Sequence, residues 1–199
     1  MAYSDFTLSR VRKELGIHIT EVSELFKDVP PLAASELLRG ILDRSGRLAR
    51  VIGTEKAKSE FLIAPILAEV VAQLDEQVSL FSGTEFNIDP EKGLQGFCDF
   101  ILSQSAEQLE VTAPVITIVE AKNDNIKSGI GQCIAEMVGA QIFNQREERP
   151  TKTIYGVVTT GSSWLFMKLM SNQVEIDDRE YYINELDKIL GILIAPLKI

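Results

Sequence analysis

Hydrophobic residues recur at helical spacing in several parts of the chain. Between Lys56 and Leu74 the apolar positions form one broad face, which predicts a long amphipathic helix. Residues 33–49 show a shorter version of this pattern. Residues 129–144 predict a third helix, rich in small side chains that allow close packing against a sheet. Weaker periodicity predicts helices at residues 6–15 and 184–193.

Short apolar runs between turn residues predict strands. We expect them at residues 77–88, 94–104, 115–122, 153–160, 163–170, 173–176 and 181–183, with the fourth and fifth joined as a hairpin across Thr160-Gly161-Ser162. The order is helix, three strands, helix, hairpin, helix. This order predicts an α/β sandwich with a mixed sheet.

Length and composition favour one globular domain spanning residues 1–199. A chain of 199 residues with 45% hydrophobic content is large enough for one well-filled core. No apolar run approaches the roughly 20 residues needed to cross a bilayer. The first residues also lack a basic region followed by an apolar stretch. We therefore expect a cytoplasmic protein with no membrane association.

The net charge of -9 argues against strong non-specific binding to nucleic acid, because that binding requires clustered Lys and Arg. One stretch differs. From Arg39 to Lys58, six basic residues stand against two acidic ones. This stretch is interpreted either as a flank facing phosphate or as a solvated helix face.

Several kinds of chemistry are excluded by the residues present. Cys98 and Cys133 lie in apolar segments without metal-ligand spacing, so we expect them to be small core residues. The single histidine, His18, excludes a site that needs two histidines. No glycine-rich loop of the Walker or dinucleotide-binding type occurs, so no nucleotide cofactor is expected.

Ionisable groups stand at the ends of two predicted buried strands. Successive strand residues point to opposite faces, so Glu120 and Lys122 share one face while Ala121 points the other way. If Asp99 lies on the neighbouring strand, two carboxylates and one ammonium group converge. Such a set suits a hard divalent cation that keeps waters for a substrate phosphate. The alternative is an ion pair that holds two strands in register.

Further residues strengthen the first interpretation. Asp99, Glu120-Ala121-Lys122 on the next strand, and a helix that opens with Gln132 resemble the core of the PD-(D/E)xK nuclease superfamily. The proline of the family's Pro-Asp is replaced here by Cys98. Two segments also resemble the N-terminal nuclease domain of type I restriction enzyme R subunits and their stand-alone relatives. They are the helix segment from Glu60 to Leu67, with its proline, and the hairpin from Tyr155 to Trp164.

The resemblance covers roughly residues 56–170 and implies a fold. It implies a restriction-endonuclease-like mixed sheet flanked by helices, with the core order helix, three strands, helix, strand. On this basis residues 56–199 form the nuclease-like core. Residues 1–55 are expected to be a helical N-terminal extension, which could dimerise, cap the domain or contact a partner.

The resemblance also implies a chemistry, metal-dependent hydrolysis of phosphodiester bonds in DNA. Asp99, Glu120 and the Ala121 carbonyl would hold Mg²⁺ or Mn²⁺, and Glu60 could complete the site. Lys122 would position the attacking water and neutralise charge, and Gln132 could orient Lys122 or touch a phosphate. Two nearby carboxylates raise the pKa of a lysine, which favours electrostatic positioning by Lys122 over proton abstraction.

The biological role stays open between alternatives. One is a nuclease in restriction, repair or a mobile element, with a partner that supplies specificity, and a homodimer is one expected assembly. Another is a catalytically silent nuclease-fold protein that binds or regulates. A third is a structural subunit whose charges form an ion-pair network. The aromatic side chains at strand spacing are expected in the core rather than stacked on bases; they are Phe86, Phe97, Phe100, Trp164 and Phe166.

Overall fold

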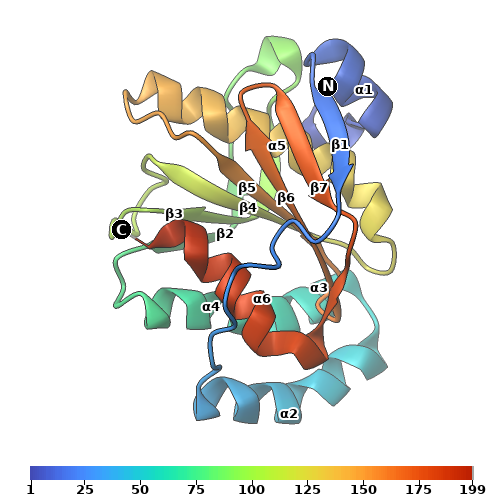
Figure 1. Ribbon diagram of the computed structural model, residues 1–199, viewed down its shortest axis with the longest axis vertical. Helices are drawn as coiled ribbons and strands as arrows, with labels where there is room; N and C mark the ends of the chain where they lie inside the picture. Colours follow the sequence, from blue (N-terminus) through green and yellow to red (C-terminus); the bar gives the residue numbers. More distant parts are fainter. Residues whose placement is uncertain (199) are drawn as a thin grey trace.

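The computed structural model describes residues 1–198, in which a mixed sheet is flanked by helices on both faces (Figure 1). The helices are α1 (Leu8–Glu14), α2 (Glu36–Ile52), α3 (Glu55–Lys58), α4 (Ala64–Gln73), α5 (Ile126–Arg146) and α6 (Leu186–Ile194). The strands are β1 (His18–Val22), β2 (Ser79–Glu85), β3 (Phe97–Ser103), β4 (Val115–Ala121), β5 (Ile154–Thr159), β6 (Ser163–Met170), β7 (Gln173–Asp177) and β8 (Tyr181–Tyr182). The prediction of a mixed α/β protein is therefore confirmed.

The strands lie in the order β1-β7-β6-β5-β4-β3-β2, and β8 pairs with β6. Two pairs are parallel, β1 with β7 and β4 with β5, and the other pairs are antiparallel. A parallel pair needs a long crossover, and α5 supplies it between β4 and β5. The central order along the chain is α4, β2, β3, β4, α5, β5.

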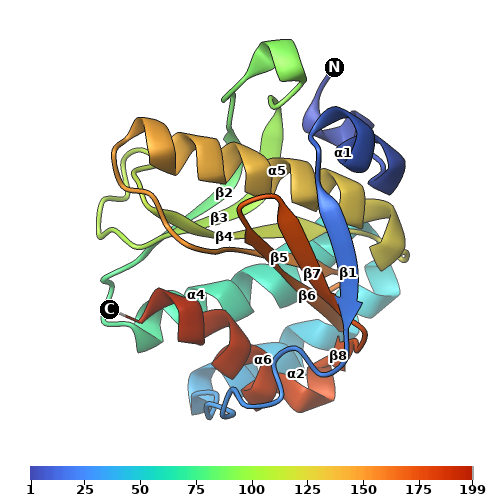
Figure 2. The same ribbon diagram turned by 45° about the horizontal axis from the view of Figure 1, so that its top comes forward.

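Two hydrophobic cores fill the space on either side of the sheet. Helices α5 and α1 cover one face, and α4 and α6 cover the other (Figure 2). Because both faces are covered, the central strand β4 is buried along its whole length. A polar group on β4 that lacks a partner within the protein is therefore costly to the fold.

The first 55 residues differ from the predicted helical extension. Strand β1 adds to the sheet by parallel pairing with β7, from His18 opposite Gln173 to Val22 opposite Asp177. The side chains of Tyr3, Phe6 and Val11 are buried in the core beside α5. Strand β1 was missed because it is a mostly exposed edge strand, which leaves little alternation of apolar and polar residues.

The predicted helix at residues 56–74 contains a π-helical turn, Ser59–Ile63, between α3 and α4. Pro65 has no N–H group to donate to the Phe61 carbonyl one turn earlier. The Ser45 hydroxyl of α2 lies 3.0 Å from that carbonyl and shares its single proton between it and the Ile41 carbonyl, at 2.7 Å. Pro65 thus leaves the Phe61 carbonyl free for a contact with α2.

The hairpin between β5 and β6 also has a structural explanation. Gly161 takes a φ of 81° in the turn, a conformation that glycine adopts without strain. The indole N–H of Trp164 donates to the Gly161 carbonyl at 3.2 Å. The Thr159 hydroxyl accepts from the Gly161 N–H at 2.9 Å. These residues fix the turn and need no ligand to account for them.

Among residues 1–198, no helix combines the length and apolarity that a bilayer crossing requires.

Candidate functional site

Strands β3 and β4 separate at the end where the predicted site lies. Their pairing ends at Phe100 opposite Val119. The side-chain alternation of β3 also breaks there, because Cys98 and Ile101, three residues apart, enter the same core. Asp99 lies at this break, and its Oδ2 accepts from the Ala121 N–H at 2.8 Å. The side chain of Asp99 therefore continues the link between the strands after their ladder ends.

Glu120 and Lys122 lie on the face of β4 that α5 covers, as the alternation predicts. Lys122 Nζ forms an ion pair with Glu120 Oε1. The same ammonium group donates to Gln132 Oε1 on α5 at 3.3 Å. The structure thus brings together four residues that the sequence analysis selected: Asp99, Glu120, Lys122 and Gln132.

Glycine allows the close approach of α5 to these side chains. A Cβ atom at Gly129 would lie 2.8 Å from the Val158 side chain and 2.9 Å from Lys122 Cε. Real Cβ contacts are longer than this, so a larger residue would displace the lysine. Gly129 therefore helps to fix the lysine stem between α5 and the sheet.

Sequence analysis missed Glu136, one turn beyond Gln132 on α5. Gln132 Nε2 donates to Glu136 Oε1 at 3.0 Å. Glu136 is fully buried, and its Oε2 has no hydrogen-bond partner. The signal was present in the sequence as a carboxylate four residues after Gln132 in a helix of small and apolar residues.

Glu60 lies apart from this cluster. Its side chain is 52% exposed and pairs with Lys56 Nζ at 2.8 Å. Glu60 was expected to complete the metal site, but the π-helical turn Ser59–Ile63 adds a residue to one turn of the helix, so counting 3.6 residues per turn does not locate its side chain. Glu55 is the acidic residue of this region whose charge acts on both Glu120 and Lys122.

Burial dominates the electrostatics of the site. Loss of solvent and the nearby charge of Asp99 raise the pKa of Glu120 to about 8, although Lys122 opposes the rise. Burial by itself lowers the pKa of Lys122, but the charge and hydrogen bond of Glu120 outweigh it, and the net shift is upward. Burial also raises the pKa of Glu136 well above its usual range. Lys122 is accordingly a cation at neutral pH.

No protein-family model matches the chain, and no match is found among curated protein sequences.

The donor atoms of the cluster suit a small divalent cation. Glu120 Oε2 is buried without a hydrogen-bond partner. The N–H and C=O of one strand residue point to the same edge, so the Ala121 carbonyl is directed towards β3 and Asp99. Within residues 1–198, no group of three or more His, Cys, Asp and Glu side chains could hold a metal. Two carboxylates and one carbonyl nevertheless fit Mg²⁺, which binds through one or two carboxylates and keeps several waters.

A polar cavity of about 340 Å³ lies just after Lys122, between the start of α5 and the β5–β6 hairpin. Ammonium, amide and hydroxyl groups make up most of its lining, and two lining residues are carboxylates. The lining residues are Lys58, Asn123, Asp124, Asn125, Ile126, Lys127, Thr160, Ser162, Ser163 and Glu180. Lys58 Nζ donates to Asp124 Oδ1 at 3.0 Å. The cavity offers hydrogen-bond donors beside the cluster, and its two lysines are balanced by the carboxylates of Asp124 and Glu180.

The aromatic residues divide into two groups. Phe86, Phe100, Trp164 and Phe166 are buried, as expected. Phe97 is 65% exposed at the start of β3, two residues before Asp99, which differs from the expected core position. Its neighbour Cys98 enters the core under α5, so Phe97 points to the opposite face of the sheet and is exposed there.

Proposed function

We propose that this chain is a divalent-metal-dependent nuclease of the PD-(D/E)xK type that hydrolyses phosphodiester bonds of DNA. The observation that carries the proposal is the meeting of Asp99, Glu120, Lys122 and Gln132 where β3 and β4 separate. The chain order α4, β2, β3, β4, α5, β5 supports it, because it agrees with the core order that the resemblance implies.

Each residue has a role that its position allows. Asp99, Glu120 and the Ala121 carbonyl would hold Mg²⁺ or Mn²⁺. The bound ion would lower the pKa of a water and stabilise charge on the scissile phosphate. Lys122, as a cation, would orient that water and neutralise developing negative charge. Gln132 holds the Lys122 ammonium group in place from α5. Glu60 would act only from a distance, since its carboxylate is paired with Lys56.

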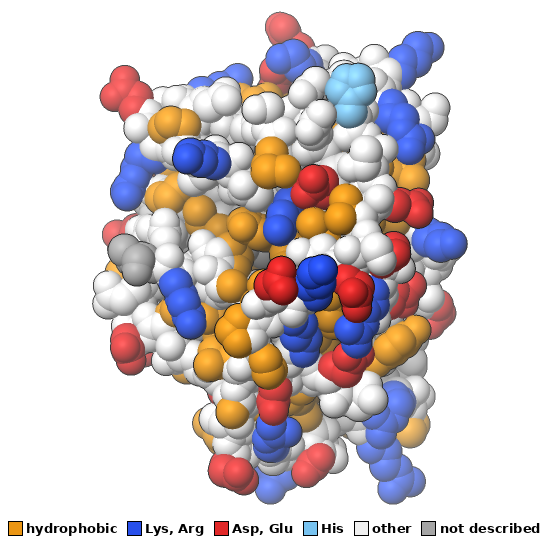
Figure 3. Space-filling view, in the orientation of Figure 1, with side chains coloured by type: hydrophobic (Ala, Val, Ile, Leu, Met, Phe, Trp, Pro, Cys, Tyr) orange, Lys and Arg blue, Asp and Glu red, His pale blue; other side chains and the backbone are white. Residues whose placement is uncertain are grey.

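The surroundings of the cluster favour a nucleic-acid strand as substrate. The neighbouring cavity presents Lys127 and hydroxyl groups that suit backbone phosphates, while Lys58 is paired with Asp124. The exposed ring of Phe97 suits stacking on a base. Basic and acidic side chains are interspersed over the face in Figure 3, and the net charge is -9. We therefore expect weak intrinsic DNA affinity and dependence on a partner protein.

The test combines metal binding with cleavage. Mn²⁺ and Mg²⁺ are titrated calorimetrically into the wild type, Asp99→Asn and Glu120→Gln, and the same samples are assayed on single- and double-stranded DNA. We expect both variants to lose metal binding and cleavage by roughly 100-fold or more. Asp28→Asn, an exposed carboxylate far from the cluster in sequence, is the matched control. Cleavage by both variants at the wild-type rate would refute the proposal.

A silent nuclease-fold protein that binds or regulates is the second candidate. The observation in its favour is the ion pair between Lys122 and Glu120, which satisfies one carboxylate oxygen without any metal. It predicts DNA binding that metal does not affect and no cleavage under any condition. The calorimetric and cleavage assays above separate the two candidates.

A further inference from the structure

Helix α2 carries a row of apolar side chains that face solvent. Leu37, Ile41, Leu48 and Val51 are 73%, 38%, 47% and 75% exposed. Together with Arg44 they are spaced alternately four and three residues apart, which is the spacing of a coiled-coil seam. We call these five residues the outer seam. Helix α2 lies at the lower end of the molecule in Figure 1, beneath α4 and α6.

The outer seam is not needed to hold α2 on the protein. A second row, displaced by one residue, faces the body of the molecule: Leu38, Leu42, Ser45 and Ala49. Ile52, at the end of the helix, is 46% exposed. Leu38 and Ala49 are buried, and the Ser45 hydroxyl binds the Phe61 carbonyl. At the start of α2, Glu69 accepts from both the N–H and the hydroxyl of Ser35 at 2.8 Å. The helix is thus anchored through its inner row and its N-terminus.

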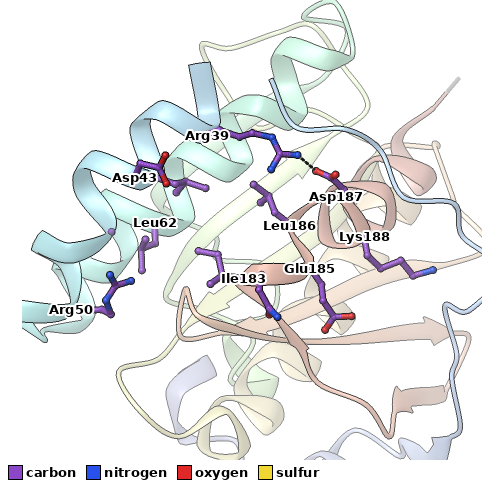
Figure 4. Close-up of a pocket in the computed structure, with 12 residues that line it drawn as sticks. Arg39, Asp43, Arg50, Leu62, Ile183, Glu185, Leu186, Asp187 and Lys188 are labelled. Atoms are coloured by element: carbon purple, nitrogen blue, oxygen red, sulfur yellow. Dashed lines mark hydrogen bonds and ion pairs between the residues drawn. The ribbon is translucent and has the colours of Figure 1, made fainter. Parts of the chain in front are cut away.

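A groove on another side of α2 is also separate from the outer seam. Figure 4 shows this groove between α2 and the start of α6, bridged by Arg39 and Asp187 at 2.6 Å. Its volume is about 540 Å³, and α2 contributes Arg39, Leu42, Asp43, Gly46 and Arg50 to its lining. The outer seam contributes none of the lining residues among positions 1–198. The seam is a surface of its own, with solvent on it.

Arg44 at the centre of the outer seam limits what can cover it. Within residues 1–198, neither Arg44 nor the adjacent Arg47 forms an ion pair. A charged side chain enclosed in an apolar seam is costly unless an opposite charge faces it. A lipid surface would draw the guanidinium of Arg44 towards the hydrocarbon, which is unfavourable.

A second copy of the chain fits poorly for the same reason. In a parallel pair, Arg44 faces Arg44 directly. In an antiparallel pair that sets Ile41 opposite Leu48, the symmetry axis falls between positions 44 and 45 and again brings the two arginines together. Like charges in a seam are repulsive and oppose that pairing.

We propose that the outer seam of α2 docks an amphipathic helix of another protein, whose apolar seam carries an acidic residue opposite Arg44. The contact is a helix-on-helix packing of four turns, with Leu37 and Val51 at its ends. The exposed side chains of one helix face bury about 1,000 Å² in total, which lies at the lower limit of specific interfaces. The interface is therefore small, and the acidic residue selects the partner.

The test uses two synthetic helical peptides of four heptads with leucine at the seam positions. One has Glu at the central seam position, and the other has Lys there. Binding to the full chain is measured by fluorescence anisotropy. We expect the Glu peptide to bind the wild type at least 10-fold more tightly than the Lys peptide. In the Arg44→Glu variant the preference should reverse, because the charges are exchanged.

A control variant separates the seam from apolar exposure in general. Leu109 is 95% exposed outside α2, so Leu109→Glu should leave peptide binding unchanged while Ile41→Glu abolishes it. The proposal is overturned if neither peptide binds at millimolar concentration, if both bind equally, or if Arg44→Glu does not reverse the preference. It is also overturned if sedimentation shows a wild-type dimer that Ile41→Glu dissociates, or if anionic vesicles bind the seam in place of the peptide. All of these measurements are independent of nuclease activity.

Discussion

At the scale of single residues, the site is organised by buried carboxylates rather than by exposed ones. Glu120 and Glu136 are both almost fully buried on the side of the sheet under α5. One carboxylate oxygen of Glu120 contacts Lys122, and one of Glu136 accepts from Gln132, which itself binds Lys122. The second oxygen of each carboxylate has no hydrogen-bond partner. Two such groups are costly to the fold as anions, so their charge state should be visible in the stability of the protein.

The first prediction concerns Glu136. The pKa of Glu136 is higher in the folded protein than in the unfolded chain, where it is about 4.5. The contribution of Glu136 to folding stability is therefore complete below about pH 4.5 and is lost as pH rises through the folded pKa. Glutamine is neutral throughout. We therefore expect the Tm of the metal-free wild type, relative to that of Glu136→Gln, to fall between pH 5 and pH 9. Calorimetric scans measure this, with the exposed Glu91→Gln as control. Parallel Tm curves for wild type and Glu136→Gln would contradict it.

The second prediction concerns Asn144, which is fully buried near the end of α5. Its side chain accepts from the Val115 N–H at 2.8 Å and donates to the Val115 carbonyl at 2.7 Å. Asn144→Ala leaves both buried backbone groups without partners, and we expect a loss of about 2–5 kcal/mol in unfolding free energy. Urea titration measures it. The exposed neighbour Gln145→Ala should lose less than about 0.5 kcal/mol, and an equal effect of both variants would exclude this role of Asn144.

At the scale of elements, two helical glycines have opposite roles. A Cβ at Gly131 of α5 would lie 2.5 Å from the Phe6 carbonyl oxygen, because the N-terminal segment crosses the helix there. A Cβ at Gly40 of α2 meets no atom within 4 Å. Glycine is therefore required at position 131, where a larger residue would meet the backbone, but no contact requires glycine at position 40.

The third prediction follows from this contrast. Gly40→Ala should raise the unfolding free energy by about 0.5–1 kcal/mol, since alanine favours a helix over glycine. Gly131→Ala should lower it by about 1–3 kcal/mol, because the backbone of Phe6 and Thr7 must move away. Denaturant titrations of the two variants measure both values. Stabilisation by Gly131→Ala would show that α1 does not pack on α5 as described.

At the scale of the whole molecule, residues 1–22 belong to the sheet and the core. Removing them would expose β7 as an edge strand and uncover the core pocket filled by Tyr3 and Phe6. The fourth prediction is that a chain starting at residue 23 aggregates or lacks a cooperative thermal transition. Circular dichroism and gel filtration test this, with the full chain alongside. A truncated chain that unfolds cooperatively at the wild-type Tm would contradict it.

Much of this architecture could be predicted because apolar spacing reports which side chains are buried. The strands at 115–122 and 163–170 and the helix at 129–144 lie close to β4, β6 and α5 for that reason. The placement of Glu120 and Lys122 on one face followed from strand alternation alone. Strand β1 could not be found in this way, since its side chains are mostly exposed. Glu60 was misplaced by a π-helical turn that no spacing rule reveals, and Glu136 became visible only through its contact with Gln132.

The parallel pairing of β1 with β7 also sets the order in which the molecule can be completed. The Thr20 hydroxyl and the Val174 carbonyl lie 154 residues apart along the chain. During synthesis, Thr20 of β1 leaves the ribosome 154 residues before Val174 of its partner strand. Contacts of such long separation form slowly. The nascent chain therefore carries β1 without its sheet partner until residues 173–177 have been synthesised, and the unpaired strand can aggregate with other chains during that interval.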